Sequence, residues 1–363
     1  MNRLASRRVV LLLYNAKSDS FTAQELVERQ LKYIYALKKL AKSDFIPPII
    51  LASGFQEVNL PSSEVCKFIS LSKRNINPLI FLLRSFFLLR RSKAKNSSYF
   101  FVAGNPLQPL AISLLLKLLF RGSALQVSIH NDLKSWFMPG LLNALKRNLL
   151  RICIPQIDLF RFVSKAQKEV AEELFPLKNK QKVICPIPVD LPSSKKNVQK
   201  DHEEILGFVG RVHEERGVSE WIEISKNLPD FRPFIVGDGP LLQNFKYELK
   251  GANLVGKYSH LQTLQTYRFF SVLLSCAPYE SYGLTIREAL LAGVPVVTRN
   301  TVGVRELLDL FPGIIKSYES VAEAVSLIRD ISVNADQKQF QLFATWFLIE
   351  QDSNLNELAS FWH

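Results

Sequence analysis

The sequence predicts an α/β protein built from two doubly wound domains. A chain of 363 residues is too long for one ordinary domain and suits two. Short apolar runs alternate with helical patterns in both halves, which is the rhythm of parallel sheets covered by helices. A proline-rich and then polar stretch separates the halves and places the boundary near 193–203. Apolar residues make up 47% of the chain, enough for two cores, and 22% charged residues exclude a disordered chain.

The first half opens with an apolar run at 7–14, as expected of a strand covered on both faces. Thr22 and Glu25 form a capping box for the next helix, and Val27 and Ile34 continue that helix at helical spacing. Further strands are predicted at 45–53, 65–71, 97–106, 124–133 and 181–190, and a strand running into a helix at 158–174. Helices are predicted at 78–95 and 107–120.

The second half restarts the same alternation. Strands are predicted at 204–211, 231–240, 252–258, 271–279 and 294–300. Helices are predicted at 217–228, 240–250, 261–270 and 285–293, and later near 318–331, 336–350 and 353–362. Ligands of doubly wound sheets bind at the carboxyl ends of the strands, so we expect the site in the crevice between the two halves.

The cysteines and the apolar runs indicate a cytoplasmic protein. Four single cysteines without a C-x-x-C pair are typical of reduced, buried thiols rather than of a disulfide frame or a zinc site. The apolar run Val9–Tyr14 is shorter than a signal-peptide core, and no small-residue cleavage site follows it. No apolar run reaches the roughly 18 residues of a transmembrane helix.

The net charge of +13 is unevenly distributed. Residues 1–200 carry 32 Lys and Arg against 12 Asp and Glu, whereas residues 201–363 carry 14 against 21. The basic half suits an anionic membrane surface, which attracts such cations. We expect no nucleic-acid partner, because neither zinc-finger spacing nor an RNP-type aromatic motif is present.

Four segments of the second half follow one another in an informative order: "GFVGRVHEERGV", "IVGDGP", "VLLSCAPYESYGLTIREALLAGVPVV" and the weaker "VGVRELL". With these segments the chain resembles the family-4 retaining glycosyltransferases, the glycosyl transferases group 1 with an E-x7-E motif. The resemblance implies the GT-B fold, in which two Rossmann-like domains face a central cleft. It implies an acceptor-binding domain at 1–195, a nucleotide-sugar-binding domain at 203–345 and a C-terminal helical segment at 346–363 that packs back on the first domain.

Two arginines are candidate ligands of a diphosphate. Gly210 and Arg211 follow a strand, and Arg216 comes five positions later, so two cations lie on one turn. An arginine can hold a diphosphate with two parallel hydrogen bonds. The family usually has a lysine where this chain has Arg216, which keeps the charge and changes the shape. The alternative is two solvated arginines beside a helix start.

The segment "ESYGLTIRE" carries the other candidates. The first N–H groups of a helix are unpaired and the helix dipole is positive there, so Gly283, Leu284 and Thr285 are expected to meet the phosphates. By resemblance, Glu288 accepts hydrogen bonds from the ribose, and Glu280 faces the donor sugar or the reaction centre. For Glu280 the alternative is a simple cap of the helix.

Three further features have a functional and a structural interpretation. His130 ends a strand, and the resemblance implies a catalytic histidine facing the sugar or the acceptor hydroxyl. Gly239 belongs to a tight turn that serves either the nucleotide or the fold alone. Residues 78–95 align Arg84, Arg91 and Lys95 on a Phe- and Leu-rich helix, which suits either a membrane-interface helix or a core helix with a basic tail.

The sequence therefore predicts a retaining, metal-independent glycosyltransferase of the hexosyltransferase type. Its donor would be a nucleotide-diphospho-sugar, with no other cofactor, and its acceptor a glycan or lipid-linked glycan of the cell envelope. It would act in the cytoplasm or at the inner face of the plasma membrane. The acceptor loop lacks the glycine pair of many relatives and offers Ser18, Ser20 and Thr22 instead. The alternatives are a GT-B sugar-nucleotide epimerase and a catalytically degenerate, membrane-associated binding subunit.

Overall fold

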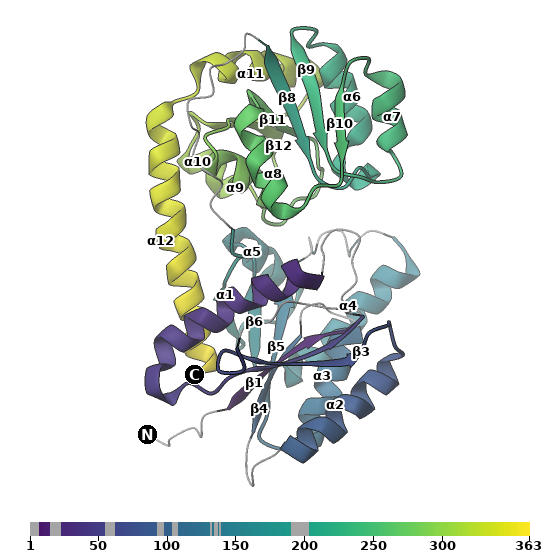
Figure 1. Cartoon of the computed structure of the whole chain (residues 1–363), viewed down its shortest axis with the longest axis vertical. Helices are drawn as coiled ribbons and strands as arrows, with labels where there is room; N and C mark the ends of the chain where they lie inside the picture. Colours follow the sequence, from purple (N-terminus) through teal and green to yellow (C-terminus); the bar gives the residue numbers. More distant parts are fainter. Residues whose placement is uncertain are drawn as a thin grey trace. The chain divides into compact units, whose positions relative to one another are not determined.

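The computed structural model describes residues 7–14, 23–54, 62–92, 98–103, 108–130, 133, 137, 139–189 and 203–363. Several predicted features lie outside these residues: Ser18, Ser20, Thr22, Lys95 and most of the boundary region 193–203. The chain forms two compact units, one of residues 1–188 with 351–363 and one of residues 189–350 (Figure 1). Each unit contains one parallel sheet, so the predicted α/β class with two doubly wound sheets is confirmed.

The first unit holds a seven-stranded sheet in the order β3-β2-β1-β4-β5-β6-β7. Its strands are β1 (Arg8–Leu13), β2 (Ile49–Ser53), β3 (Lys67–Ser72), β4 (Tyr99–Ala103), β5 (Ala124–Ile129), β6 (Leu159–Phe162) and β7 (Gln181–Ile184). Its helices are α1 (Ala23–Ala41), α2 (Pro78–Ser92), α3 (Gln108–Leu119), α4 (Leu141–Cys153) and α5 (Lys165–Leu174). The order reverses between β1 and β4, and the carboxyl ends of strands at such a switch point are where ligands bind.

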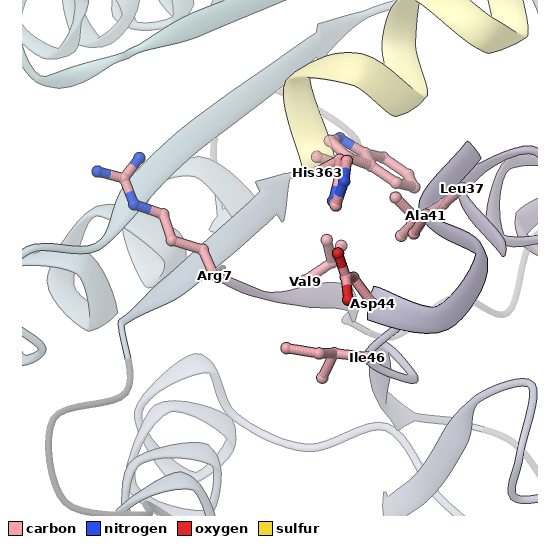
Figure 2. A pocket seen from close by; sticks show the side chains of 8 residues that line it. Arg7, Val9, Leu37, Ala41, Asp44, Ile46 and His363 are labelled. Atoms are coloured by element: carbon pink, nitrogen blue, oxygen red, sulfur yellow. The ribbon is translucent and has the colours of Figure 1, made fainter. Parts of the chain in front are cut away.

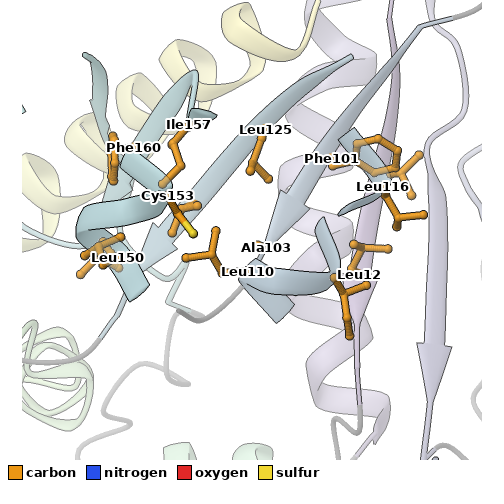
Figure 3. Packing of buried hydrophobic residues seen from close by; sticks show 14 of the residues in the cluster. Leu12, Phe101, Ala103, Leu110, Leu116, Leu125, Leu150, Cys153, Ile157 and Phe160 are labelled. Carbon is orange, nitrogen blue, oxygen red and sulfur yellow. The ribbon is translucent and has the colours of Figure 1, made fainter. Parts of the chain in front are cut away.

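Helices cover both faces of this sheet. On one face, side chains of α2, α3, α4 and α5 form one apolar cluster with alternate strand residues such as Phe101, Leu125 and Phe160 (Figure 3). On the other face, Tyr33, Ile34 and Leu37 of α1 pack with residues at the end of α12 (Gln337–Trp362). Burial on both faces explains why the strands are continuous apolar runs rather than alternating ones.

A polar network fastens α1 and the end of α12 to this second face. The Trp362 indole N–H donates to Gln126 Oε1 at 2.8 Å, and both residues are buried. Buried Arg161 donates to the Cys185 carbonyl at 2.7 Å and to the Tyr33 hydroxyl, and its guanidinium lies 4.4 Å from the centre of the Tyr33 ring. These bonds satisfy polar groups that would otherwise be costly to bury.

The second unit holds a six-stranded sheet in the order β10-β9-β8-β11-β12-β13. Its strands are β8 (Glu204–Val209), β9 (Phe231–Val236), β10 (Asn253–Gly256), β11 (Val272–Ser275), β12 (Val296–Arg299) and β13 (Ile315–Tyr318). Its helices are α6 (Val218–Lys226), α7 (Leu242–Glu248), α8 (His260–Thr266), α9 (Leu284–Leu291), α10 (Arg305–Leu310) and α11 (Val321–Asn334). Buried Trp221 and Phe245 stand edge to face in its core.

The structure corrects two expectations for the last sixty residues. The helix predicted near 318–331 starts later, at Val321, because residues 315–318 form the edge strand β13, which the sequence reading missed. The two helices predicted at 336–350 and 353–362 are one continuous helix, α12. No glycine or proline lies between the two predicted helices, so nothing in the chain interrupts the backbone ladder there.

Candidate functional site

The candidate site lies in the second unit, at the carboxyl ends of β8, β9 and β11. Its floor is formed by the loops after β8 and β9, which press against each other through two glycines. A Cβ on Gly237 would lie 1.8 Å from the Gly210 carbonyl oxygen, and a Cβ on Gly239 would lie 2.3 Å from the Val212 oxygen. The Val212 N–H donates to the Asp238 carbonyl at 2.9 Å. Gly239 therefore has a demonstrable structural task in this floor.

A second glycine contact brings Arg216 to the loop after β11. Arg216 ends a short 3-10 helix (Glu214–Arg216), and Gly217 follows in the left-handed region at φ 65°. A Cβ on Gly217 would lie 2.3 Å from the Cys276 carbonyl oxygen, so only glycine allows this close approach. The turn after β8 is thereby fixed beside the segment that contains Glu280.

Arg216 and Glu280 form an ion pair across these two loops. Arg216 Nη1 donates to Glu280 Oε2 at 2.8 Å, and both side chains are largely shielded from solvent. Arg216 Nε is buried and has no hydrogen-bond acceptor among the described residues. A buried cationic N–H without an acceptor is costly, so this donor favours an anionic oxygen arriving from outside the protein.

Arg211 lies on the same turn but points elsewhere. It forms an ion pair with Glu215, and both side chains are about half exposed. Such an exposed pair contributes little to stability, so Arg211 can exchange this partner for another anion at small cost. The structure thus joins Arg216 to Glu280 and leaves Arg211 at the rim of the turn.

The loop from Glu280 to Gly283 is held in place by contacts with Gly303, which belongs to the weakest of the four sequence segments, residues 302–308. The Gly303 N–H donates to the Glu280 carbonyl at 2.7 Å, and a Cβ on Gly303 would lie 2.4 Å from the Tyr282 nitrogen. Buried Arg287 donates to the Gly303 carbonyl at 3.1 Å and stacks 3.8 Å from the centre of the Tyr282 ring. Sequence reasoning assigned no role to Arg287 or Gly303.

Gly283 then turns the chain into α9. It adopts the left-handed conformation at φ 72° as the N-cap of the helix, and no side chain caps α9 there. The N–H groups of Leu284 and Thr285 belong to the first turn, where helix N–H groups have no partner inside the helix. This geometry offers amide donors and the positive end of the helix dipole to an anion.

Glu288 lies one turn further along α9 and is only 2% exposed. The Tyr267 hydroxyl donates to Glu288 Oε2 at 2.9 Å, and His260 Nδ1 lies 3.8 Å from Glu288 Oε1. Burial, with Glu288 adding to it, raises the pKa of Tyr267 well above its ordinary value, so the phenol stays protonated and keeps donating. Sequence reasoning missed both residues: His260 begins α8, and Tyr267 follows the end of that helix in a short 3-10 turn.

His130 belongs to the first unit and follows β5. Burial, together with the nearby positive charges of Arg161 and Arg29, lowers the pKa of His130 to about 3. The imidazole is therefore neutral at neutral pH, so it can donate or accept a hydrogen bond but adds no positive charge. This state suits contact with a hydroxyl group better than with a phosphate.

A small cavity elsewhere in the chain does not compete with this site. A small cavity of about 10 Å³ between β1, α1 and the C-terminal Trp362 and His363 has Arg7 and Asp44 in its lining (Figure 2). It has room for about one water molecule. Among the described residues, no group of His, Cys, Asp and Glu is arranged to hold a metal ion. No helix of the described chain is both long and apolar enough to cross a bilayer.

Residues 191–339 match the model of a family described as glycosyl transferases group 1. A curated relative, the 2-deoxystreptamine N-acetyl-D-glucosaminyltransferase of Niallia circulans, is 29% identical over 116 residues, which cover 28% of this chain and 30% of the relative. The chain thus matches less than a third of the length of this and similar curated relatives. The residues that match the family model lie within the unit that carries the candidate site.

Solved structures cover nearly the whole chain. The sucrose-phosphate synthase of Thermosynechococcus elongatus superimposes with a TM-score of 0.71 at 14% identity, covering 98% of both chains. The Anabaena protein HepE in complex with UDP-glucose superimposes with a TM-score of 0.66 at 14% identity, covering 97% of this chain and 98% of that one. The chain therefore has the GT-B fold that the sequence resemblance implied.

Proposed function

We propose that this protein is a glycosyltransferase that takes a sugar from a nucleotide-diphospho-sugar and transfers it to a hydroxyl acceptor with retention of configuration. The observation that carries the proposal is Arg216, whose buried Nε has no acceptor among the described residues and whose Nη1 holds Glu280, in the loop that leads to the uncapped start of α9. The match of residues 191–339 to glycosyl transferases group 1 supports it, as does the fold shared with a UDP-glucose complex.

The diphosphate would lie between the turn after β8 and the start of α9. Arg216 supplies a guanidinium, and the Leu284 and Thr285 amides supply donors fixed in place before the reaction. Arg211 joins them by leaving its exposed pair with Glu215. Charge that builds up on the departing diphosphate is stabilised by groups that need no rearrangement, which is the main electrostatic source of catalysis in many enzymes.

Glu280 would face the sugar that is being transferred. In this structure its carboxylate neutralises Arg216. When a phosphate binds Arg216, it competes with that contact, so the carboxylate becomes available to a positively charged, oxocarbenium-like sugar. The acceptor hydroxyl would attack from the face that the diphosphate leaves, and neutral His130 would orient a hydroxyl of the sugar or of the acceptor.

Glu288 would accept hydrogen bonds from the ribose hydroxyls. We propose Tyr267 as a positioning residue, because its bond to Oε2 fixes the direction of the other carboxylate oxygen. A fixed, desolvated carboxylate discriminates strongly in favour of a substrate with hydroxyls, since a partner without them leaves a buried charge unpaired.

The proposed reaction uses no metal ion and no cofactor besides the donor, because arginines and helix amides supply the positive charge at the diphosphate. The proposed acceptor is a glycan or lipid-linked glycan of the cell envelope, and the proposed place of action is the cytoplasm, at the inner face of the plasma membrane. The basic first half of the chain supports that location.

Thermal unfolding in the presence of UDP-, GDP- and ADP-sugars tests the donor site. A donor at a hundred times its Kd stabilises the folded protein by about 2.7 kcal/mol, which is readily measured. We expect at least one donor to stabilise the wild type and not Arg216→Gln, whereas Arg329→Gln, at an exposed position of α11, behaves like the wild type. If no donor stabilises the wild type, or if Arg216→Gln responds equally, the donor site is wrong.

Release of nucleoside diphosphate from the stabilising donor tests the chemistry. We expect slow donor hydrolysis by the wild type and a loss of at least about 100-fold in Glu280→Gln, as for the removal of one catalytic electrostatic group. Binding without any release would favour the degenerate binding subunit. Release with interconversion of the sugar's stereochemistry would favour an epimerase.

A further inference from the structure

The outer surface formed by α2, α3 and α4 in the first unit does not resemble an ordinary solvated helix face. All three helices bury residues in one cluster against the same face of the sheet, and α2 packs against α3 (Figure 1). Lys117 of α3 links this helix to the segment that follows α4, because its Nζ donates to the Gln156 carbonyl and forms an ion pair with Asp158. The three helices thus form one layer, whose solvent side we call the α2–α4 face.

Helix α4 turns its most apolar side away from the protein core. Leu141, Leu145 and Ile152 lie on one stripe of the helix, and they are 80%, 54% and 74% exposed. The core receives Leu150 and Cys153 instead. An amphipathic helix of a soluble domain normally directs its apolar stripe inward, so this orientation indicates a missing apolar partner.

Helices α2 and α3 extend the same surface. The residues with large apolar side chains exposed on them are Leu79, Ile80, Leu83, Phe87, Leu115, Leu118 and Leu119. Cations lie among these side chains, including exposed Arg90 and Arg91 at the end of α2. On α4, Arg147 and Arg151 lie over the rings of Phe137 and Phe175, 5.1 and 5.9 Å from the ring centres.

The charge of the whole chain is concentrated in this segment of the sequence. Residues 67–157 contain 14 Lys and Arg and one acidic residue, Asp132, so they carry a net charge of +13. The rest of the chain contains 32 basic and 32 acidic residues and is formally neutral. None of α2, α3 and α4 contains an aspartate or a glutamate. These three helices therefore present no carboxylate that would repel an anionic partner.

We propose that the α2–α4 face binds the surface of an anionic lipid bilayer, with α4 lying in the plane of the interface. Such an interface accepts both components of the face at once, because leucines enter the acyl boundary while cations stay among the headgroups. Each cation near an anionic leaflet adds about 1 kcal/mol. A helix of 13 residues is too short to span a bilayer, which favours an orientation parallel to it. The inference is independent of the donor site.

Flotation of the full-length protein with phosphatidylglycerol and with phosphatidylcholine vesicles tests the proposal. We expect capture by the anionic vesicles only, with a loss as the salt concentration rises. The variant Leu141→Gln, Leu145→Gln, Ile152→Gln is expected to lose at least about tenfold in binding, since each buried side chain contributes more than 1 kcal/mol. These positions are exposed, so the variant should fold normally, and its thermal midpoint is measured in parallel.

A matched control places the same change elsewhere. Leu310→Gln, Leu342→Gln, Ile349→Gln alters three exposed apolar residues of the second unit, and it should float like the wild type. A charge variant with Arg90→Gln, Arg91→Gln and Arg121→Gln, the last at an exposed position two residues after α3, should float less. The same change at three exposed lysines of the second unit, Lys246→Gln, Lys250→Gln, Lys338→Gln, should not reduce flotation. Equal flotation of each variant and its control would overturn the proposal. So would no capture of the wild type, or a wild-type dimer that the α4 variant converts to a monomer.

Discussion

The ion pair between Arg216 and Glu280 allows a sharp test of the proposed mechanism. If Glu280 neutralises the arginine that grips the diphosphate, the carboxylate competes with the ligand in the resting protein. Glu280→Gln should therefore abolish transfer and at the same time strengthen the binding of a nucleoside diphosphate. An ordinary active-site substitution weakens both, so the opposite directions of the two effects identify this competition.

The size of the effect follows from the burial of the pair. The Arg216 and Glu280 side chains are 30% and 15% exposed, so the pair is worth more than a fully exposed one and less than a deeply buried one. About 1 kcal/mol is reasonable for such a pair, which corresponds to a gain of roughly fivefold in affinity for UDP or GDP. Arg216→Gln, in contrast, removes a charge-assisted contact of about 1.5–3 kcal/mol and should weaken binding by roughly 10- to 100-fold.

Isothermal titration calorimetry with UDP and with GDP measures all four members of the double-mutant cycle. In the Arg216→Gln background, Glu280→Gln should bring no gain, because the cation for which the carboxylate competes is absent. A gain of the same size in both backgrounds would refute the competition and indicate simple long-range repulsion. A loss of affinity in the single variant Glu280→Gln would refute it as well.

Three further changes have defined outcomes. Tyr267→Phe should weaken UDP or GDP binding by about 1.5–3 kcal/mol, as calorimetry can show, and leave the binding of the 2′,3′-dideoxy analogue nearly unchanged, because that analogue has no ribose hydroxyls to donate to Glu288. Folding stability should fall as the pH drops from 6.5 to about 3, because over this range His130 takes up a proton in the unfolded chain but not in the folded one. Denaturant unfolding at several pH values should show a smaller decrease for His130→Gln than for the wild type. Trp362→Phe leaves Gln126 Oε1 without its donor and should cost about 1–3 kcal/mol of stability in the same assay, whereas a loss near zero would show that the bond is not important.

Most strands and the donor-side loops could be predicted from the sequence because each has a local signature. Apolar runs of strand length marked most of the strands, and Gly210, Gly217 and Gly283 marked turns that only glycine can form. The short strand β13 was missed because "IKSY" contains too few apolar residues to be recognised alone. Its pairing with β12, a contact between distant segments, makes it a strand.

The partners of the site residues were harder to predict than the residues themselves. Tyr267 and His260 meet Glu288 only because the segment containing α8 packs beside α9, and Arg287 meets Tyr282 across a turn. These contacts have no short-range pattern in the sequence. The orientation of α4 was equally invisible, because a helix with leucines on one side and arginines on the other gives no sign of which side faces the core.

The bond between Trp362 and Gln126 joins residues 236 positions apart and closes the core of the first unit with the last turn of α12. During synthesis, the second unit emerges from the ribosome before that turn does. The first unit must therefore wait, with one face of its sheet incompletely covered, until residues 351–363 arrive, whereas residues 189–350 form a unit that is continuous in the sequence. Expression of the first unit alone would have to supply these thirteen residues as a fused or separate segment.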